Sequence, residues 1–448
     1  MNLLRAALIF PCLAVAAERP FDDYARGGNL EFVAHAHRAL AAAKPEENAF
    51  WSPASLQAAL AALGEGSRTV SAKEIAGLLR LPAPKGPDPD FALLHAFNRA
   101  TAEHLGSAIT TSAGPDSPEL VFAYRAAGHL WVQEDFAVKD AFVATLQDAY
   151  GSAMLRKADF RRRAEGVRAE ANQLIEKETE GLLKQALPKG FFNEETRVAF
   201  AHVVHLRADW SQPFNASETR PAPFRGADGE TRYVPTMTDP RRRLRYAAFE
   251  ADGRAFSTPK QVPYGNDDGD PRHYPGGGGC QVVTIPYHGC RASMVVVLPT
   301  GGGTLPALEA RLTAPRLDAM LRSGEEYSCF VRWPKFKARA DWDLVSVLPK
   351  LGLTSVFDIG RADLSGIAAP PPPLYVSRFL QKGELEVNER GTIAAVVTAF
   401  GIAAGVGMGE RPKSRPFVPR FVADHPFLYL ITDDQTGQVL FMGRVLRP

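Results

Sequence analysis

Hydrophobic side chains recur at helical spacing in several parts of the chain. Leu30, Val33 and Leu40 fall on one face of residues 29–43, with polar neighbours between them. Apolar residues three or four positions apart form the buried stripe of an amphipathic helix, so this segment is predicted to be helical. The same pattern predicts further helices over residues 53–63, 91–97, 142–150 and 167–175, and the capping-box pattern of Ser71 with Glu74 predicts another helix that begins at Ser71.

Apolar runs between these segments predict strands. Residues 198–206 form a long run and residues 129–133 a shorter one. Two pairs of runs are separated by short loops, and each pair predicts a buried hairpin. The first hairpin is expected from residues 281–287 and 293–298, and the last from residues 427–431 and 439–445.

The stretch from Glu386 to Gly409 differs from the rest. Between Gly391 and Gly409 it has no charged residue and no proline, and most of its side chains are small or β-branched, which suits a strand. An apolar strand without a partner exposes free backbone donors and acceptors. Charged residues and prolines follow at 410–419, and these belong on a surface. The pattern predicts a strand that is exposed in one state and inserted elsewhere in another.

Three motifs carry a resemblance to a known family. Residues 386–395, Glu-Val-Asn-Glu-Arg-Gly-Thr-Ile-Ala-Ala, resemble the reactive-loop hinge of the serpins, and residues 423–448 resemble that family's C-terminal signature. Asn48, followed by Ser52-Pro53 and Ser55, resembles its shutter motif. The resemblance implies an α+β fold in one serpin domain over residues 18–448. Three β-sheets, about eight to nine helices, and a hinge with a long exposed reactive loop over residues 386–420 are expected.

The resemblance also implies a mechanism of protease inhibition. A serine protease attacks the exposed loop and forms an acyl-enzyme, and the cleaved loop inserts into the central sheet and traps the protease. The inhibitor has no catalytic residues, metal or cofactor of its own. Insertion of an apolar strand would yield a gross gain above about 10 kcal/mol, so the uninserted form is expected to be metastable. The implied hinge residues are Glu386, Glu389, Gly391, Thr392, Ala394, Ala395 and Val396.

Two residues of the loop depart from the family's pattern. Ile393 stands where the family usually has an acidic residue, and Phe400 is bulky. Both keep a second function open, that of a non-inhibitory serpin-fold protein acting as a carrier, chaperone or storage protein.

The position of the cleaved bond has two predictions. Counting forward from the hinge places it near Gly405–Val406, and counting back from His425-Pro426 places it near Arg415–Pro416, so the loop is longer than usual. The trap needs a fixed distance from the hinge, which favours residues 404–408 and an elastase-like or chymotrypsin-like protease. A trypsin-like protease is the second choice, with Lys413–Ser414 a better site than a bond before proline. The candidate residues are Ala404, Gly405, Val406, Met408, Lys413, Ser414, Arg415 and Pro416.

The shutter and breach regions of the family's central sheet are assigned to Asn48, Ser52, Pro53, Ser55, His202, Trp210 and Gln381. His202 stands where the family commonly has Asn, and Gln381 where it commonly has His. We hypothesise that a His202–Gln381 pair replaces an Asn–His hydrogen bond under the sheet. The alternative is two unrelated substitutions.

The N-terminal residues 1–17 have one basic residue, a short apolar run and an Ala-Val-Ala site, which predicts a signal peptide and a secreted, extracellular protein. Asn215-Ala-Ser217 is a glycosylation pattern that a secreted protein can use. In an oxidising compartment Cys280 and Cys290 could form a disulfide and leave Cys329 free.

Charge and loop composition limit the partners. A net charge of +2 gives no support to nucleic-acid binding. The arginines at 161–163 and 241–243 could bind a glycosaminoglycan, but a solvated surface is the simpler interpretation. Residues 255–280 are rich in Gly, Pro and Asp and end near four glycines, which predicts a disordered insertion.

Other chemistry finds little support. The chain has no Gly-x-Ser-x-Gly, His-Glu-x-x-His or phosphate-loop motif, so no enzyme is predicted. Residues 391–409 are long enough to cross a bilayer, but they lack Leu and precede strand-forming segments that need the same core. No membrane partner is expected, and the protein is expected to be a monomer.

Overall fold

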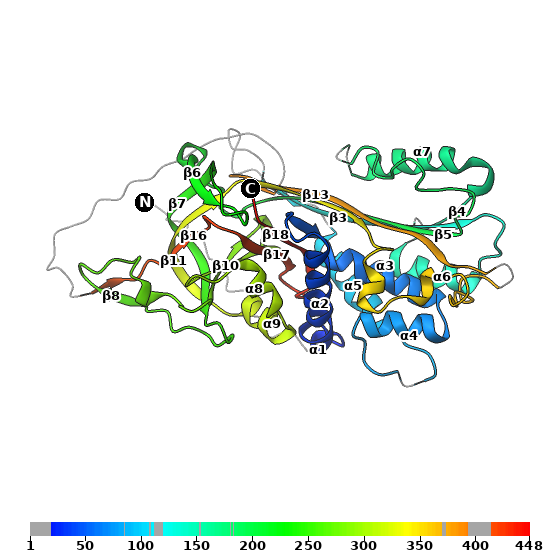
Figure 1. Cartoon of the computed structure of the whole chain (residues 1–448), viewed down its shortest axis with the longest axis horizontal. Helices are drawn as coiled ribbons and strands as arrows, with labels where there is room; N and C mark the ends of the chain where they lie inside the picture. The colour runs from blue at the N-terminus through cyan, green and yellow to red at the C-terminus, as the bar shows by residue number, and fades with distance from the viewer. Residues whose placement is uncertain are drawn as a thin grey trace, which may run out of the picture.

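The computed structural model describes residues 19–84, 86–106, 109–111, 120–151, 154–179, 181, 183–369, 373–392 and 414–448. These residues form two large β-sheets, a two-stranded ribbon and nine α-helices (Figure 1). The α-helices are α1 (Asp22–Arg26), α2 (Gly28–Ala43), α3 (Pro53–Gly66), α4 (Thr69–Leu78), α5 (Ala92–Leu105), α6 (Asp140–Tyr150), α7 (Phe160–Glu178), α8 (Leu305–Ala310) and α9 (Ala314–Arg322). Short 3-10 helices are η1 (Ala216–Glu218), η2 (Pro271–His273), η3 (His288–Cys290), η4 (Leu348–Leu351) and η5 (Ser355–Phe357).

The seven-stranded sheet runs along the upper side of the molecule in Figure 1. In spatial order its strands are β12 (Phe336–Asp343), β13 (Val376–Val387), β14 (Gly391–Thr392), β5 (Val198–Asp209), β3 (Leu120–Gln133) and β2 (Ile109–Thr111), and β4 (Leu155–Ala158) pairs with β3. Most neighbours are antiparallel, but β13 and β5 also pair directly and run parallel.

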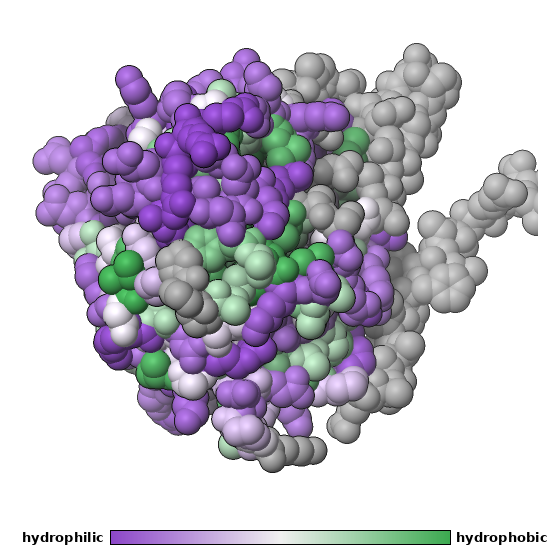
Figure 2. Space-filling model, turned by 90° about the vertical axis from the view of Figure 1, so that its right-hand side faces the viewer, coloured by the Kyte–Doolittle hydropathy of each residue, from purple (hydrophilic) through white to green (hydrophobic). Residues whose placement is uncertain are grey.

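Helices cover both faces of this sheet. On one face, Phe160 and Ile175 of α7 form a buried cluster with Trp131 and Leu380 of the sheet. On the other face α3 packs against β3 and β5 through a largely buried surface. Figure 2 shows the end of the molecule that lies at the right of Figure 1, where hydrophilic side chains cover the upper part, around α7. The central strands are therefore covered on both faces, which explains their continuous apolar runs.

The nine-stranded sheet combines segments from the beginning, middle and end of the chain. In spatial order it contains β1 (Ala49–Trp51), β18 (Val439–Val445), β17 (Phe427–Asp433), β10 (Ala292–Pro299), β9 (Cys280–Pro286), β7 (Thr231–Phe249), β11 (Glu325–Pro334) and β16 (Arg420–Val422), with β6 (Arg220–Arg225) paired to β7. Every residue of β10, β17 and β18 is buried. β18 lies between β17 and β1, so the last strand completes the pairing of the first.

The ribbon lies at the left-hand end of Figure 1 and joins β8 (Gln261–Pro263) to β15 (Ser414–Pro416). β8 belongs to the segment 255–280, which the sequence predicts to be disordered; the structure differs, because the segment holds β8 and η2. The glycines of this segment do not make it disordered. They let its backbone pack closely against residues 301–303. A Cβ atom at Gly301 would lie 2.6 Å from the carbonyl carbon of Gly276.

The predicted fold class is confirmed: the chain is an α+β protein with three sheets and nine α-helices in the described residues. The predicted helices and hairpins are present, and β3 extends well beyond residues 129–133. The capping box is wrong. α4 begins at Thr69, the Ser71 side chain is buried inside the helix, and Glu74 accepts hydrogen bonds from the backbone N–H groups of Thr354 and Ser355.

The disulfide that the sequence left open between Cys280 and Cys290 does not form, because Cys280 is a buried free thiol. Cys280 begins β9, and Cys290 lies in η3 beyond the other end of that strand. Seven extended residues span about 20 Å, whereas a disulfide needs Cα atoms within about 7 Å. Cys329 is a second buried free thiol.

Candidate functional site

The site is the line between β5 and β13, here called the seam. In one part of the seam, here called its closed part, the two strands pair in parallel, from Val376 opposite Val198 to Gly383 opposite Val204. Beyond this point they separate, and β14 lies between them. Gly391 is opposite Asp209 of β5, and Thr392 is opposite both Ala208 of β5 and Val387 of β13. The seam is therefore closed at one end and holds the start of an additional strand at the other.

Gly391 is required at the entry to the seam. A Cβ atom there would lie 2.1 Å from the carbonyl oxygen of Ala208 and 2.5 Å from the Cα atom of Asp209. Both obstacles are backbone atoms of β5, which cannot move aside without breaking strand pairs. Only glycine lets β14 approach β5 this closely.

A tight turn at residues 388–390 directs the chain from β13 into the seam. The side-chain oxygen of Asn388 accepts hydrogen bonds from the N–H groups of Arg390 (3.0 Å) and Gly391 (3.3 Å). The N–H of Asn388 donates to the carbonyl of Gly391 (3.0 Å). Nε of Arg390 donates to the buried carboxylate of Asp209 at 2.8 Å. The turn is thus fixed from inside and tied to β5.

An aromatic cluster supports this turn. The Trp210 indole N–H donates to the carbonyl of Asn388 (3.0 Å), and its ring stacks on Tyr287 with centroids 4.6 Å apart. The Tyr287 hydroxyl lies 2.7 Å from Oγ1 of Thr392, the first buried hydroxyl of the inserted strand. The structure therefore brings Trp210, which was assigned to the breach, together with the hinge residues Gly391 and Thr392 at the end of the seam that holds β14. Asn388, Tyr287 and Asp209 were not predicted.

The two glutamates of the hinge have different environments. Glu389 contacts Lys335 (Oε2 to Nζ, 2.9 Å) and accepts a hydrogen bond from the Thr219 hydroxyl (2.8 Å). Its partial burial tends to raise its pKa, but hydrogen bonds from the backbone, Lys335 and Thr219 outweigh this and hold the pKa below its usual value. Glu386 pairs with Lys337 at 2.8 Å in an exposed position. Only Glu389 takes part in the packed turn.

The closed part of the seam is bonded to the N-terminus of α3. The Gln381 side chain accepts from the N–H of Ser52 (2.9 Å) and donates to the Ser52 carbonyl (3.0 Å). Ser52 is the N-cap of α3, with Pro53 in the first turn, and its hydroxyl donates to the Leu440 carbonyl (2.6 Å). Gln381 is 1% exposed, so these bonds are shielded from water.

His202 stands opposite Gln381 in the strand register and is also buried. Its Nδ1 lies 2.9 Å from the hydroxyl of Ser55, and among the described residues its Nε2 has no hydrogen-bond partner. The ring occupies space that Gly128 leaves free, since a Cβ atom there would lie 2.6 Å from the imidazole. Burial, with a smaller contribution from His129, lowers the pKa of His202 to about 3. The hypothesis of a direct His202–Gln381 bond is therefore corrected: both residues bond to α3.

Asn48 does not belong to this arrangement. Its side-chain oxygen accepts from the N–H groups of Leu446 (2.7 Å) and Arg447 (3.1 Å), and its amide donates to the carbonyl of Arg447 (2.6 Å). It fixes the segment that follows β18, away from the seam.

The residues proposed for the cleaved bond divide into two groups. Hinge residues Ala394, Ala395 and Val396 and the candidates Ala404, Gly405, Val406, Met408 and Lys413 lie outside the described residues. Ser414, Arg415 and Pro416 form β15, paired with β8. The Arg415 guanidinium contacts both carboxylate oxygens of Asp268 at 2.9 Å. The trypsin-like candidate is thus engaged within the protein itself.

Two surface predictions concern other sites. Asn215 is exposed and caps η1, with its side-chain oxygen accepting from the N–H of Ser217 at 3.0 Å, and glycosylation stays a prediction. In the first arginine cluster, Arg161 pairs with Asp135 and Arg163 with Glu170. In the second, Arg243 pairs with Glu326. These pairs reduce the local positive charge that a glycosaminoglycan would need.

The described residues include no helix that is both long and apolar enough to cross a membrane. Within the same ranges, no group of three or more His, Cys, Asp or Glu side chains is placed to hold a metal ion.

The fold and the seam define a protein whose central sheet already contains the first residues of an additional strand. A family model described as Serpin (serine protease inhibitor) matches residues 28–448. The chain therefore belongs to the serpin family.

Several known proteins are similar over nearly the whole chain. Leukocyte elastase inhibitor of Equus caballus is 28% identical over 430 residues, covering 94% of this chain and 98% of the relative. Putative non-inhibitory serpin-10 of Oryza sativa subsp. japonica is 31% identical over 411 residues, covering 90% and 94%. The crystal structure of native protease nexin-1 with heparin matches with a TM-score of 0.72 at 22% identity, covering 95% of this chain and 99% of that one. Uncleaved ovalbumin matches with a TM-score of 0.71 at 22% identity, covering 94% and 100%.

Proposed function

We propose that the protein inhibits serine proteases by inserting its cleaved reactive loop into the seam between β5 and β13. The observation that carries the proposal is β14, which already lies between these strands and is antiparallel to both. In the closed part of the seam, β5 and β13 pair in parallel. Insertion would replace one parallel ladder by two antiparallel ladders, which are slightly more stable per residue.

Continuing the register of β14 defines how a longer strand would fit. Thr392 is opposite Ala208 and Val387, so six residues further on Thr398 would come opposite His202 and Gln381. These two residues are now each other's neighbours in the seam. Insertion must therefore separate them at the level where both are bonded to α3. Because both residues are bonded to the same end of α3, their bonds to Ser52 and Ser55 must rearrange when the strands separate.

The protease supplies the chemistry of this reaction. Its serine attacks a loop carbonyl, an ester forms, and the peptide on the C-terminal side leaves with a new amino group. The N-terminal part of the loop stays joined to the protease through the ester and enters the seam. The inhibitor contributes a strand without buried charge, a glycine entry at Gly391 and a seam that can open.

We propose an elastase-like or chymotrypsin-like target that cuts within residues 404–408. The similarity to a leukocyte elastase inhibitor supports this class. The pairing of Arg415 with Asp268 makes Arg415–Pro416 a poor alternative. A trypsin-like protease acting at Lys413–Ser414 stays the second choice.

The test is incubation with elastase, chymotrypsin and trypsin, followed by a denaturing gel. A covalent band at the summed mass is expected, and N-terminal sequencing of the released peptide identifies the bond. Thr398→Asp would place a charge between His202 and Gln381 and is expected to abolish the adduct while leaving cleavage intact. Thr398→Ser is the matched control and should retain the adduct. Cleavage without an adduct and without a rise in Tm would refute the proposal.

A second candidate function is that of a non-inhibitory serpin. One relative carries that description at 31% identity, and Ile393 and Phe400 depart from the inhibitory pattern. This candidate predicts clean cleavage by all three proteases. Secretion and the monomeric state stay predictions. N-terminal sequencing of the expressed protein tests removal of residues 1–17, and sedimentation tests the monomer.

A further inference from the structure

The segment 255–279, here called the arm, contacts the carboxyl-terminal part of the reactive loop, residues 414–420, here called the leg. β8 of the arm pairs with β15 of the leg, with Val262 opposite Arg415. Nη1 of Arg415 lies 2.9 Å from both carboxylate oxygens of Asp268, and Nη2 donates to the carbonyl of Asn266 at 2.8 Å. Both side chains of the ion pair are at most a quarter exposed.

Further hydrogen bonds continue along the leg beyond the ribbon. The N–H of Phe417 donates to the carbonyl of Lys260 (3.0 Å). The N–H of Val418 contacts Oδ1 of Asp268 (3.3 Å), and the N–H of Arg420 donates to the hydroxyl of Tyr274 (2.9 Å). The leg is therefore bonded to the arm through its backbone up to the start of β16.

An apolar contact accompanies these bonds. Phe417 of the leg and Val262 of the arm are each 2% exposed. The rings of His273 and Tyr274 lie 5.1 Å and 6.1 Å from the Phe417 ring. A buried phenyl group and a shielded ion pair make this contact more stable than a surface ribbon alone.

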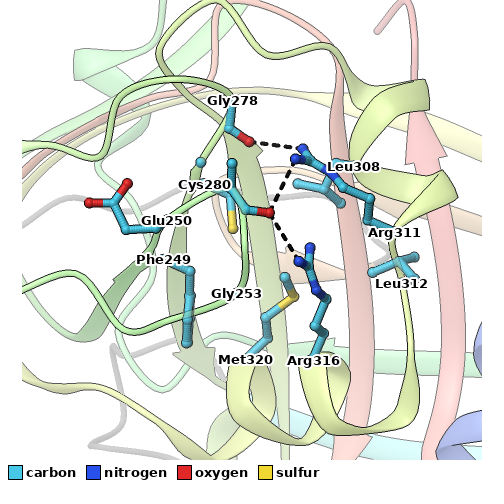
Figure 3. A pocket seen from close by; sticks show the side chains of 12 residues that line it. Phe249, Glu250, Gly253, Gly278, Cys280, Leu308, Arg311, Leu312, Arg316 and Met320 are labelled. Atoms are coloured by element: carbon cyan, nitrogen blue, oxygen red, sulfur yellow. Dashed lines mark hydrogen bonds between the residues drawn. The ribbon is translucent and has the colours of Figure 1, made fainter.

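The arm is itself fixed to the body of the protein. Figure 3 shows Arg311 and Arg316 pointing toward the backbone where the arm joins the body of the protein. Arg311 donates to the carbonyls of Gly278 (2.9 Å) and Ala251 (3.1 Å), and Arg316 also donates to the carbonyl of Ala251 (3.0 Å). Near its other end, Lys260 pairs with Glu325 and lies over the ring of Tyr327 in β11. The arm can therefore hold the leg against a rigid support.

We propose that the arm determines which bonds of the reactive loop a protease can cut, by holding the leg out of reach. A protease binds its substrate as a free extended strand, and the leg is already paired with β8. Bonds at and beyond Ser414 are thus withheld, which counts against Lys413–Ser414, the second choice above, and makes Asp268 the specificity-determining residue. The leg, held by the arm, also accounts for the additional length of this loop. Counting forward from the hinge and counting back from His425 can therefore give different positions for the cleaved bond. This inference rests on the proposed role of the loop.

The first test measures the contact directly, by hydrogen exchange of the amides of Arg415, Phe417, Val418 and Arg420 in the intact protein. Asp268→Asn and Arg415→Gln each remove the ion pair and are expected to accelerate exchange at least tenfold. Asp252→Asn is the matched control, because the exposed ion pair of Asp252 with Arg254 lies outside the contact between arm and leg, and this variant should exchange like the wild type. Exchange within twofold of the wild type in both ion-pair variants would overturn the proposal. This result does not depend on inhibition.

The second test measures selectivity. Trypsin is expected to cut Lys413–Ser414 at least tenfold faster in Asp268→Asn than in the wild type or Asp252→Asn, with the peptides identified by mass. Equal rates would show that the arm does not protect the leg, and would overturn the proposal even if a protease adduct forms. Protection without any adduct would support the arm and refute inhibition instead.

Discussion

Gln381 and His202 face each other across the seam, yet each is bonded to the N-terminus of α3 and not to the other. One helix end therefore holds both strands at the point where an inserting strand must pass. The two sides of the seam are connected through Ser52 and Ser55, which are three residues apart in α3 and its cap. Loss of either bond should loosen the closed seam.

Gln381→Ala is expected to destabilise the protein by about 1–3 kcal/mol, because it leaves the buried N–H of Ser52 without a partner, while the Ser52 carbonyl keeps its bond from the N–H of Leu56. Glu384→Ala on the same strand is the control. It removes an exposed ion pair with Arg339 and should cost at most about 0.5 kcal/mol. Urea unfolding measures both, and an equal cost for the two variants would contradict the importance of the bonds to Ser52.

Gly391→Ala is expected to expel β14 from the seam, because its Cβ atom would clash with the backbone of β5. The change should lower Tm and increase the rate of proteolysis at the hinge. Gly77→Ala is the matched substitution: Gly77 lies in α4 with nothing within 4 Å of the added atom, and alanine favours a helix by about 1 kcal/mol. A loss of stability in Gly77→Ala and none in Gly391→Ala would reverse the prediction.

The low pKa of His202 predicts a loss of stability in acid. Between the unfolded value of about 6.5 and the folded value of about 3, the unfolded chain binds a proton that the folded chain does not. Above pH 6.5 the imidazole is neutral in both the folded and the unfolded chain, so it does not change the free energy of unfolding. Below pH 6.5 the free energy of unfolding falls by up to about 1.4 kcal/mol for each unit of pH. Burial raises the pKa of Asp434 to about 7, which gives the opposite slope.

The comparison of His202→Asn with the wild type isolates this histidine, since Asp434 contributes equally to both. Denaturant unfolding at pH 4, 5, 6 and 7 is the measurement. The difference between the two proteins should change by about 2–3 kcal/mol across the range. A constant difference would show that His202 is not shielded from protons.

The two hinge glutamates provide a further pair of variants. Glu389→Gln should cost about 1 kcal/mol, because the charge is partly buried between Lys335 and Thr219. Glu386→Gln breaks an exposed pair with Lys337 and should cost at most about 0.5 kcal/mol. Since the folded pKa of Glu389 is lowered, its contribution should be present above the unfolded pKa and vanish as the pH falls. Thermal unfolding at pH 7 and at pH 3.5 is the measurement, and an equal loss of stability in Glu389→Gln at both pH values would contradict this prediction.

Much of the fold was readable from side-chain patterns, because strands buried on both faces give apolar runs and helices with one buried face give a helical period. β12 was not recognised as a strand, although its burial alternates strictly from Phe336 to Asp343. Polar and small residues hide such strands from a search for continuous apolar runs. The family resemblance assigned Gly391 and Thr392 to the hinge, and in the structure both residues pair with β5 at the entry to the seam.

Contacts between distant segments could not be predicted. Ser71 and Glu74 match a local capping pattern, but tertiary contacts with residues 354–355 take both side chains. The glycines before Cys280 suggested disorder, whereas they pack against residues 301–303. The pairing of Asp268 with Arg415 joins residues 147 positions apart, and neither residue carries a signal of the other. The spacing of residues along the chain gives no information on such long-range contacts.

The order of strands in the larger sheet has a consequence for biosynthesis. β1, at residues 49–51, has its partner in β18, at residues 439–445. A growing polypeptide must therefore present an unfilled edge to the cytosol or translocon for nearly four hundred codons before translation supplies the matching segment. Nascent chains of this protein should depend on chaperones until synthesis has passed residue 445, and a stop codon before that position should yield an aggregating product.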